Sequence, residues 1–116
     1  MLRASAEAEG HSVDLRGIVD AGVAIGVPAA GILVAFADAV IGNDEHRLAE
    51  AREAVLAELG AAGLLGAASI AANFCRNDRI ANAIGIPLER DFVTQSEDFR
   101  AALGINNFPS ARNTLG

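Results

Sequence analysis

Apolar side chains recur at helical spacing through the first third of the chain. From about Ser12 to Ile25 they form a stripe that predicts an amphipathic helix, with Ser12 as its N-terminal cap. Gly26 is a typical helix stop, and Pro28 suits the first turn of a second helix, which we expect over about 28–41. No run of alternating apolar and polar residues predicts a strand.

Two further helices are expected on either side of Gly60. The one before it can be capped by Asn43 or Asp44, and it carries one apolar and one acidic face. The one after it, about 61–84, has no charged residue over 61–74. A helix that is apolar all round is normally buried all round, and a chain of 116 residues has little room for that. We therefore expect a second chain, or a missing segment, to cover part of this helix.

Turn residues divide the last third of the chain. Gly85 ends the long helix, and a Thr-x-x-Glu capping-box pattern at 94–97 predicts a short last helix that runs through Leu103 to a stop at Gly104. The sequence thus predicts an all-α fold of about five helices. Its organisation is expected to be a flexible N-terminus at 1–10, a single helical domain at 11–104 and an irregular C-terminal tail at 105–116.

Composition and charge exclude several classes of function. Hydrophobic types make up 52% of the residues and aromatic types 4%, which suits closely packed helices built from small side chains. The net charge is −6, all nine basic residues are arginine, and they form no basic patch. Binding to nucleic acid or to an anionic membrane is therefore not expected.

The chain is expected to be cytoplasmic. Its first ten residues lack the apolar segment of a secretory signal, and the single cysteine, Cys75, cannot form an internal disulfide. The uncharged stretch from Ala21 to Ala37 is near the lower limit of a membrane span. Pro28 and three glycines interrupt it, however, so two buried helices are the favoured interpretation and no membrane partner is expected.

The most informative polar group follows the uncharged stretch. Asn73, Arg76 and Asn77 lie within one helical turn of one another and Arg79 follows them, so their polar ends can converge on a binding pocket. The favoured alternative is a polar helix end that orders a contact between chains. Two roles are open for Cys75. Its neighbour Arg76 can favour a reactive thiolate, but we favour the role of a small core residue.

Neither a metal nor a cofactor is expected. The two histidines, His11 and His46, stand apart from any cysteine cluster, which is not the pattern of a metal site.

The segment from Asn73 to Glu89 carries a longer pattern, N-F-x-x-x-x-R-I-A-x-A-x-G-I-P-L-E. It resembles the C-terminal half of uncharacterised peroxidase-related members of the carboxymuconolactone decarboxylase / alkylhydroperoxidase D-like superfamily, and the likeness extends over roughly residues 30–116. The resemblance implies an alkylhydroperoxidase D-like helical bundle that assembles into homo-oligomers. This agrees with the expectation that the helix at 61–84 mediates self-association.

The resemblance also exposes a missing motif. Active peroxidase-type relatives carry a C-x-x-C-x-x-x-H motif. With His11 on its histidine, the two cysteine positions fall on Ala4 and Glu7. Without these thiols, dithiol peroxidase chemistry has no nucleophile. The first interpretation is therefore a divergent, non-peroxidase binding or assembly subunit.

Two alternatives remain. One is a cofactor-independent decarboxylase-type enzyme in which His11 acts as acid and base and Arg76 or Arg79 holds an anionic substrate. The other is one half of a peroxidase, completed by a partner chain that supplies an N-terminal half.

Overall fold

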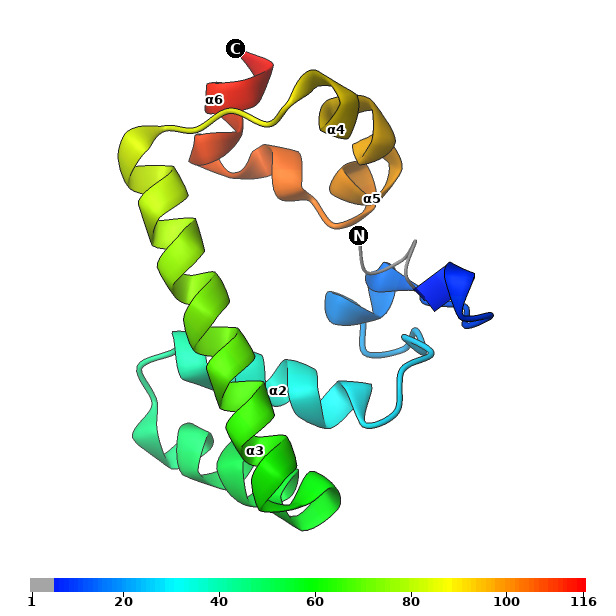
Figure 1. The fold of residues 1–116 in the computed structure, drawn as a ribbon. Helices are drawn as coiled ribbons and strands as arrows, with labels where there is room; N and C mark the ends of the chain where they lie inside the picture. Colours follow the sequence, from blue (N-terminus) through cyan, green and yellow to red (C-terminus); the bar gives the residue numbers. More distant parts are fainter. Residues whose placement is uncertain (1–5) are drawn as a thin grey trace. The chain divides into compact units, whose positions relative to one another are not determined.

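The computed structural model describes residues 6–116, and every regular element in them is a helix (Figure 1). The all-α prediction is confirmed for this part of the chain. The fold divides into two compact units, each described by itself below. Unit 1 combines the described residues up to Gly26 with Ile80–Gly116, and unit 2 is Val27–Arg79. The predicted domain at 11–104 stays a prediction, and residues 1–5 of the expected flexible N-terminus lie outside the described residues.

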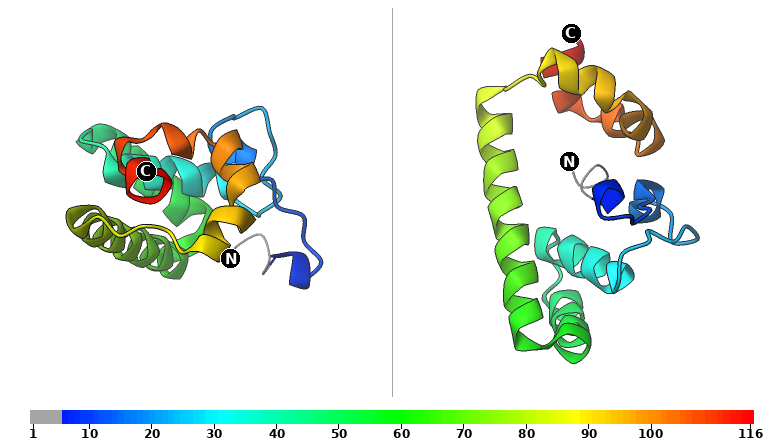
Figure 2. Two further views of the ribbon diagram at one scale, coloured as in Figure 1. Left: turned by 90° about the horizontal axis from the view of Figure 1, so that it is seen from above. Right: turned by 45° about the vertical axis from the view of Figure 1, so that its right-hand side comes forward.

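Unit 2 is built from α2 (Ala30–Ile41) and most of α3 (Glu45–Ile84). The backbone of α3 leaves helical geometry at Gly60, with φ 71° and ψ −178°, so α3 consists of a first arm (45–59) and a second arm (61–84). The second arm is a long rod, and the first arm turns back beside its lower end (Figure 2, right). This break confirms the predicted division at Gly60. Glycine suits the position because it adopts a positive φ without strain.

The core of unit 2 is small. It consists of Phe36 and Ala39 from α2 and Val55 from the first arm, with 4%, 2% and 0% of their surfaces exposed. The helix expected over about 28–41 is confirmed in position, although it begins at Ala30, after Ala29 in a left-handed conformation (φ 56°).

The helix predicted from about Ser12 to Ile25 is wrong. The segment forms one 3-10 turn, η1 (Leu15–Ile18), and then folds back so that the backbone N–H of Asp14 donates to the carbonyl of Ile25 at 2.9 Å. A Cβ on Gly17 would lie 2.5 Å from the carbonyl oxygen of Val23. The close return of the chain therefore requires glycine at position 17, and the same glycine weakens helix formation.

Unit 1 continues after the second arm with short helices. Gly85 and Gly104 adopt positive φ values of 67° and 68°, which confirms the two predicted stops. The last twelve residues, expected to be irregular, contain two 3-10 turns and one short helix. The elements of unit 1 after α3 are, in order, α4 (Arg90–Gln95), α5 (Glu97–Ala102), η2 (Ile105–Asn107), η3 (Pro109–Ala111) and α6 (Arg112–Leu115).

The capping box predicted at 94–97 is also wrong. Thr94 lies inside α4, and α5 begins at Glu97 with Ser96 as its N-terminal neighbour. The Ser96 hydroxyl donates to the carbonyl oxygen of Phe92 and makes no side-chain capping bond. A serine hydroxyl can bond the carbonyl four residues earlier as well as cap a helix, and here the tertiary contacts select the first of these bonds.

Candidate functional site

The polar residues predicted to converge on α3 do so in part. Arg76 Nη2 donates to Asn73 Oδ1 at 2.8 Å and to Asn77 Oδ1 at 3.4 Å. All three side chains are exposed, and Arg79, also exposed, does not take part in these hydrogen bonds. None of the four residues lines a pocket described below, so they form a surface hydrogen-bond group and not a cavity.

His11 stands apart from that group. It is exposed in unit 1, ahead of η1, and its backbone N–H donates to the carbonyl of Ala6 at 2.8 Å. It lines none of the pockets described here. Within residues 6–116, no group of three or more histidine, cysteine, aspartate or glutamate side chains is placed to hold a metal ion.

The uncharged second arm of α3 is covered on one side within the chain. Its half-buried positions recur at helical spacing and include Leu64, Ala68, Ala71 and Cys75, so Cys75 is on the covered side. Leu65, Ile70 and Phe74 are 69%, 62% and 61% exposed. Ile70 and Phe74 are spaced i, i+4 and lie on one side of the helix, whereas Leu65 lies on another side, at the hollow described next. Ile70 and Phe74 are called the apolar face below.

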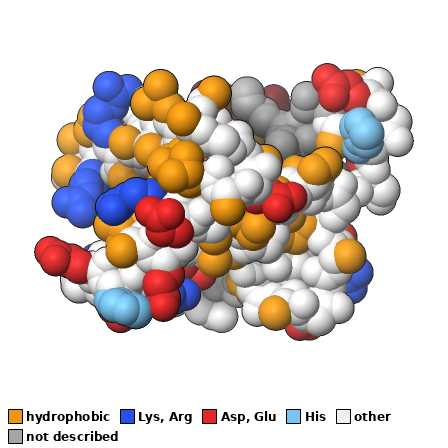
Figure 3. All heavy atoms as spheres, turned by 90° about the horizontal axis from the view of Figure 1, so that it is seen from below, with side chains coloured by type: hydrophobic (Ala, Val, Ile, Leu, Met, Phe, Trp, Pro, Cys, Tyr) orange, Lys and Arg blue, Asp and Glu red, His pale blue; other side chains and the backbone are white. Residues whose placement is uncertain are grey.

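A hollow in unit 2 adjoins this arm. It has a volume of about 460 Å³ and lies between α2 and both arms of α3. Its lining is apolar except for Arg52; the other members are Phe36, Val40, Leu48, Ala61, Leu64, Leu65 and Ala68. Figure 3, a view from below, shows hydrophobic side chains at the surface between arginines and acidic residues. Unit 2 exposes both this hollow and the projecting side chains of the apolar face.

Of the helices in the described chain, α3 is the one long and apolar enough to cross a membrane, by length and composition alone. Of the residues in its most apolar 18-residue stretch, 6% are buried inside the chain.

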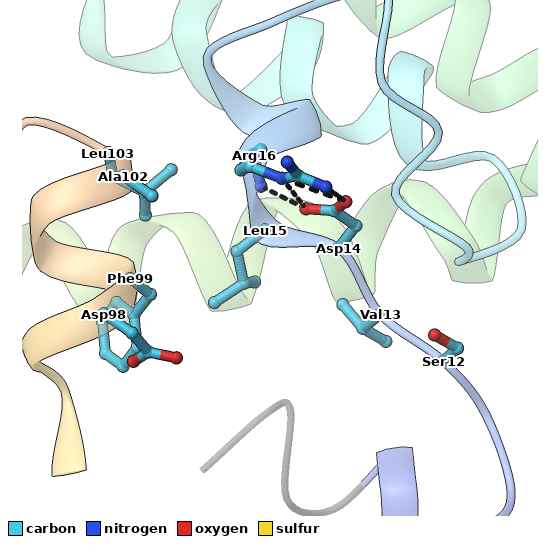
Figure 4. A pocket seen from close by; sticks show the side chains of 9 residues that line it. All are labelled: Ser12, Val13, Asp14, Leu15, Arg16, Asp98, Phe99, Ala102 and Leu103. Carbon is cyan, nitrogen blue, oxygen red and sulfur yellow. Dashed lines mark hydrogen bonds and ion pairs between the residues drawn. The ribbon is translucent and has the colours of Figure 1, made fainter.

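Unit 1 contains a pocket of about 340 Å³ between η1 and α5 (Figure 4). Leu15 points from η1 towards Phe99 of α5, and the Asp14–Arg16 ion pair lies beside it. Arg16 donates from its side chain and from its backbone N–H to the Asp14 carboxylate, and these bonds lower the Asp14 pKa to about 2. The charges of Asp14 and Arg16 compensate each other, so neither of them is available to bind a charged ligand in this pocket.

A second cavity in unit 1 surrounds a residue that the sequence pattern did not indicate. Arg100 of α5 is 8% exposed and lines a cavity of about 220 Å³. Its guanidinium donates from Nε to Ser96 Oγ at 2.9 Å, from Nη1 to Asn106 Oδ1 at 2.7 Å and from Nη2 to the carbonyl of Val93 at 2.7 Å. All three acceptors are neutral.

The sequence signal for this site was weak. Ser96 and Arg100 are spaced i, i+4, which places them on one side of a helix. Nothing in that spacing indicates that an arginine is buried, because most arginines are solvated. Burial of Arg100 depends on Asn106 and the short helices after Gly104, which lie in the segment expected to be irregular.

Comparison of the chain with protein-family models, with curated proteins and with solved structures finds no match.

Proposed function

We propose that this protein is a non-peroxidase helical assembly subunit, and that the second arm of α3 packs against a second copy of the chain. The observation that carries the proposal is the apolar face. Ile70 and Phe74, one helical turn apart, are each more than 60% exposed on a helix without charge from Ala61 to Cys75. The alkylhydroperoxidase-like pattern in the sequence supports the same proposal, since that resemblance implies homo-oligomers.

Burial of the apolar face would supply a substantial driving force. Removing one large apolar side chain from water contributes about 1.5–3 kcal/mol. Gly66 is exposed one helical turn before Ile70, and no atom lies within 4 Å of the position a Cβ would take there. A neighbouring helix can therefore approach the backbone closely beside Ile70.

The geometry of α3 favours a protein partner over a lipid bilayer. Gly60 interrupts the helix, and Arg76, Asp78 and Arg79 follow the uncharged stretch. The uninterrupted, uncharged helix from Ala61 to Cys75 is about 22 Å long at ~1.5 Å per residue, shorter than the ~30 Å hydrocarbon core of a membrane.

Charge favours a second copy as that partner. Glu58 precedes the apolar stretch, and Arg76, Asp78 and Arg79 follow it with one positive charge in excess. In an antiparallel pair the acidic end of each copy meets the basic end of the other, at both ends of a two-fold interface. Arg76 bonds to neutral amide oxygens in the single chain, which leaves its charge available to a carboxylate of the partner. Such exposed pairs contribute little energy but set the orientation.

Sedimentation velocity over a range of protein concentrations tests the proposal. We expect the natural chain to associate reversibly and Ile70→Glu or Phe74→Glu to sediment as a monomer, because each places a charge in the interface. Ile41→Glu is the matched control: this side chain is 71% exposed at the end of α2, and its replacement should leave association unchanged. A natural chain that stays monomeric, or that binds neutral phosphatidylcholine vesicles through the apolar face, would overturn the proposal.

Two measurements separate the alternative functions. A thiol peroxidase requires hydroperoxide turnover that Cys75→Ser abolishes, whereas we expect no turnover in either form. A decarboxylase-type enzyme requires turnover of a small carboxylate that His11→Ala abolishes without a change in oligomer size. Turnover sensitive to either substitution would replace the assembly role with an enzymatic one.

A further inference from the structure

Arg100 is a buried cation that has no carboxylate partner among residues 6–116. It is 8% exposed, and its three hydrogen bonds go to a hydroxyl, an amide oxygen and a backbone carbonyl. Burying a charge is costly unless an opposite charge or several hydrogen bonds compensate it. The neutral acceptors satisfy part of this requirement, and the positive charge itself has no counter-charge within the part of the chain that the structure describes.

The guanidinium retains hydrogen-bonding capacity. An arginine side chain carries five N–H donors, and the bonds to Ser96, Asn106 and Val93 use one each from Nε, Nη1 and Nη2. Nη1 and Nη2 therefore each keep one N–H. A carboxylate accepts charge-assisted hydrogen bonds from such donors.

The cavity beside Arg100 suits an anion with an apolar body. In the described chain its lining contains no acidic residue, although the protein as a whole carries a net charge of −6. Its large apolar lining residues are Ile86, Leu88, Ile105, Phe108 and Leu115, beside two alanines, and its uncharged polar ones are three asparagines, a serine and a threonine. All of them belong to unit 1, so the cavity is complete within one compact unit.

We propose that this cavity binds a small organic carboxylate, with the carboxylate on Arg100 and an apolar ring or short chain against Ile86, Leu88 and Phe108. The volume of about 220 Å³ equals that of about seven water molecules at ~30 Å³ each, which suits a single ring or a short aliphatic chain. The site is separate from the apolar face of α3, and it stands whether or not the chain assembles.

Isothermal titration calorimetry with benzoate, benzamide and inorganic phosphate tests the site. Benzamide keeps the ring without the charge, and phosphate keeps a charge without the ring. We expect benzoate to bind at least tenfold more tightly than either. Equal binding of benzoate and benzamide, a preference for phosphate, or no heat of binding at millimolar benzoate would overturn the proposal.

A matched pair of variants locates the binding site. Ala81 lines the cavity on the last turns of α3, whereas Ala83, two residues further on, is exposed and does not line it. Ala81→Leu fills the cavity and should weaken benzoate binding at least tenfold, and Ala83→Leu should leave it unchanged. Neither variant alters the Arg100 hydrogen bonds, and circular dichroism verifies the fold of each. Undiminished binding in folded Ala81→Leu would contradict the assignment.

Arg100→Lys tests the guanidinium separately. Lysine keeps the positive charge and loses the guanidinium donors, so benzoate binding should weaken at least tenfold in the folded variant. Unchanged affinity in that variant would exclude recognition by the Arg100 guanidinium.

Discussion

Ser96 Oγ accepts a hydrogen bond from Arg100 Nε at 2.9 Å, one helical turn further along the chain. The same hydroxyl donates to the carbonyl oxygen of Phe92. Ser96 thus connects α4 to the buried guanidinium of α5, and it is itself 2% exposed. This small polar network holds Arg100 at the cavity wall.

Ser96→Ala should lower the stability of the protein by about 1–3 kcal/mol, because it removes the hydroxyl that Arg100 Nε donates to and leaves that buried donor unsatisfied. Urea unfolding monitored by circular dichroism measures the change. Ser12→Ala, at an exposed serine, is the control and should stay within about 0.5 kcal/mol of the natural chain. Equal stability of the two variants would show that the network contributes nothing.

Phe36→Ala should lower stability by about 3–5 kcal/mol, because it leaves a cavity in the small core of unit 2. Phe74→Ala, at a residue of the same type that is 61% exposed, should have little effect at low protein concentration. If α3 mediates assembly, the effect of Phe74→Ala should grow with protein concentration. Thermal unfolding at several concentrations measures both variants, and equal losses at high dilution would contradict the assigned core.

Gly60→Ala should lower stability by about 1–3 kcal/mol, because position 60 has φ 71° and ψ −178°, which a residue with a Cβ adopts only with strain. Gly31→Ala is the matched control. Gly31 is the second residue of α2, and no atom lies within 4 Å of the position that a Cβ would take there, so alanine should not lower stability. Chemical unfolding compares the two, and a stabilising Gly60→Ala would show that the arms do not need to turn at this residue.

Acid should remove the contribution of the Asp14–Arg16 pair. The Asp14 pKa is lowered from its ordinary value of 3.8 to about 2 in the folded chain. A carboxylate with a lowered folded-state pKa contributes stability that is present above pH 3.8 and is lost as the pH falls through about 2. The carboxylate is accessible to solvent, so the effect is modest.

Asp14→Asn provides the measurement. The thermal midpoint of the natural chain should exceed that of Asp14→Asn above pH 4, and the two should converge as the pH approaches 2. Glu53→Gln, at an exposed residue of α3, should show no such convergence in that interval. A constant difference between the natural chain and Asp14→Asn down to pH 2 would contradict the lowered pKa.

Local backbone chemistry made part of this fold predictable. Gly60, Gly85 and Gly104 mark the ends of helical segments in the structure, each with a positive φ that glycine adopts without strain. The helix ending at Ile41 follows from its apolar spacing. The segment from Ser12 to Ile25 has similar spacing, and yet it forms a loop with one 3-10 turn, because the contact between Asp14 and Ile25 outweighs its weak helical propensity.

Helical spacing was also enough to bring Asn73, Arg76 and Asn77 together, since neighbours within one turn meet wherever the helix lies. All-helical character and the break at Gly60 likewise follow from the order of residues, because both depend on interactions between near neighbours. Burial of Arg100 and exposure of Ile70 do not. Burial of Arg100 depends on how α4, α5 and the turn after Gly104 fold back around it, and exposure of Ile70 depends on which side of α3 the rest of the chain covers. A spacing pattern contains no information on either packing.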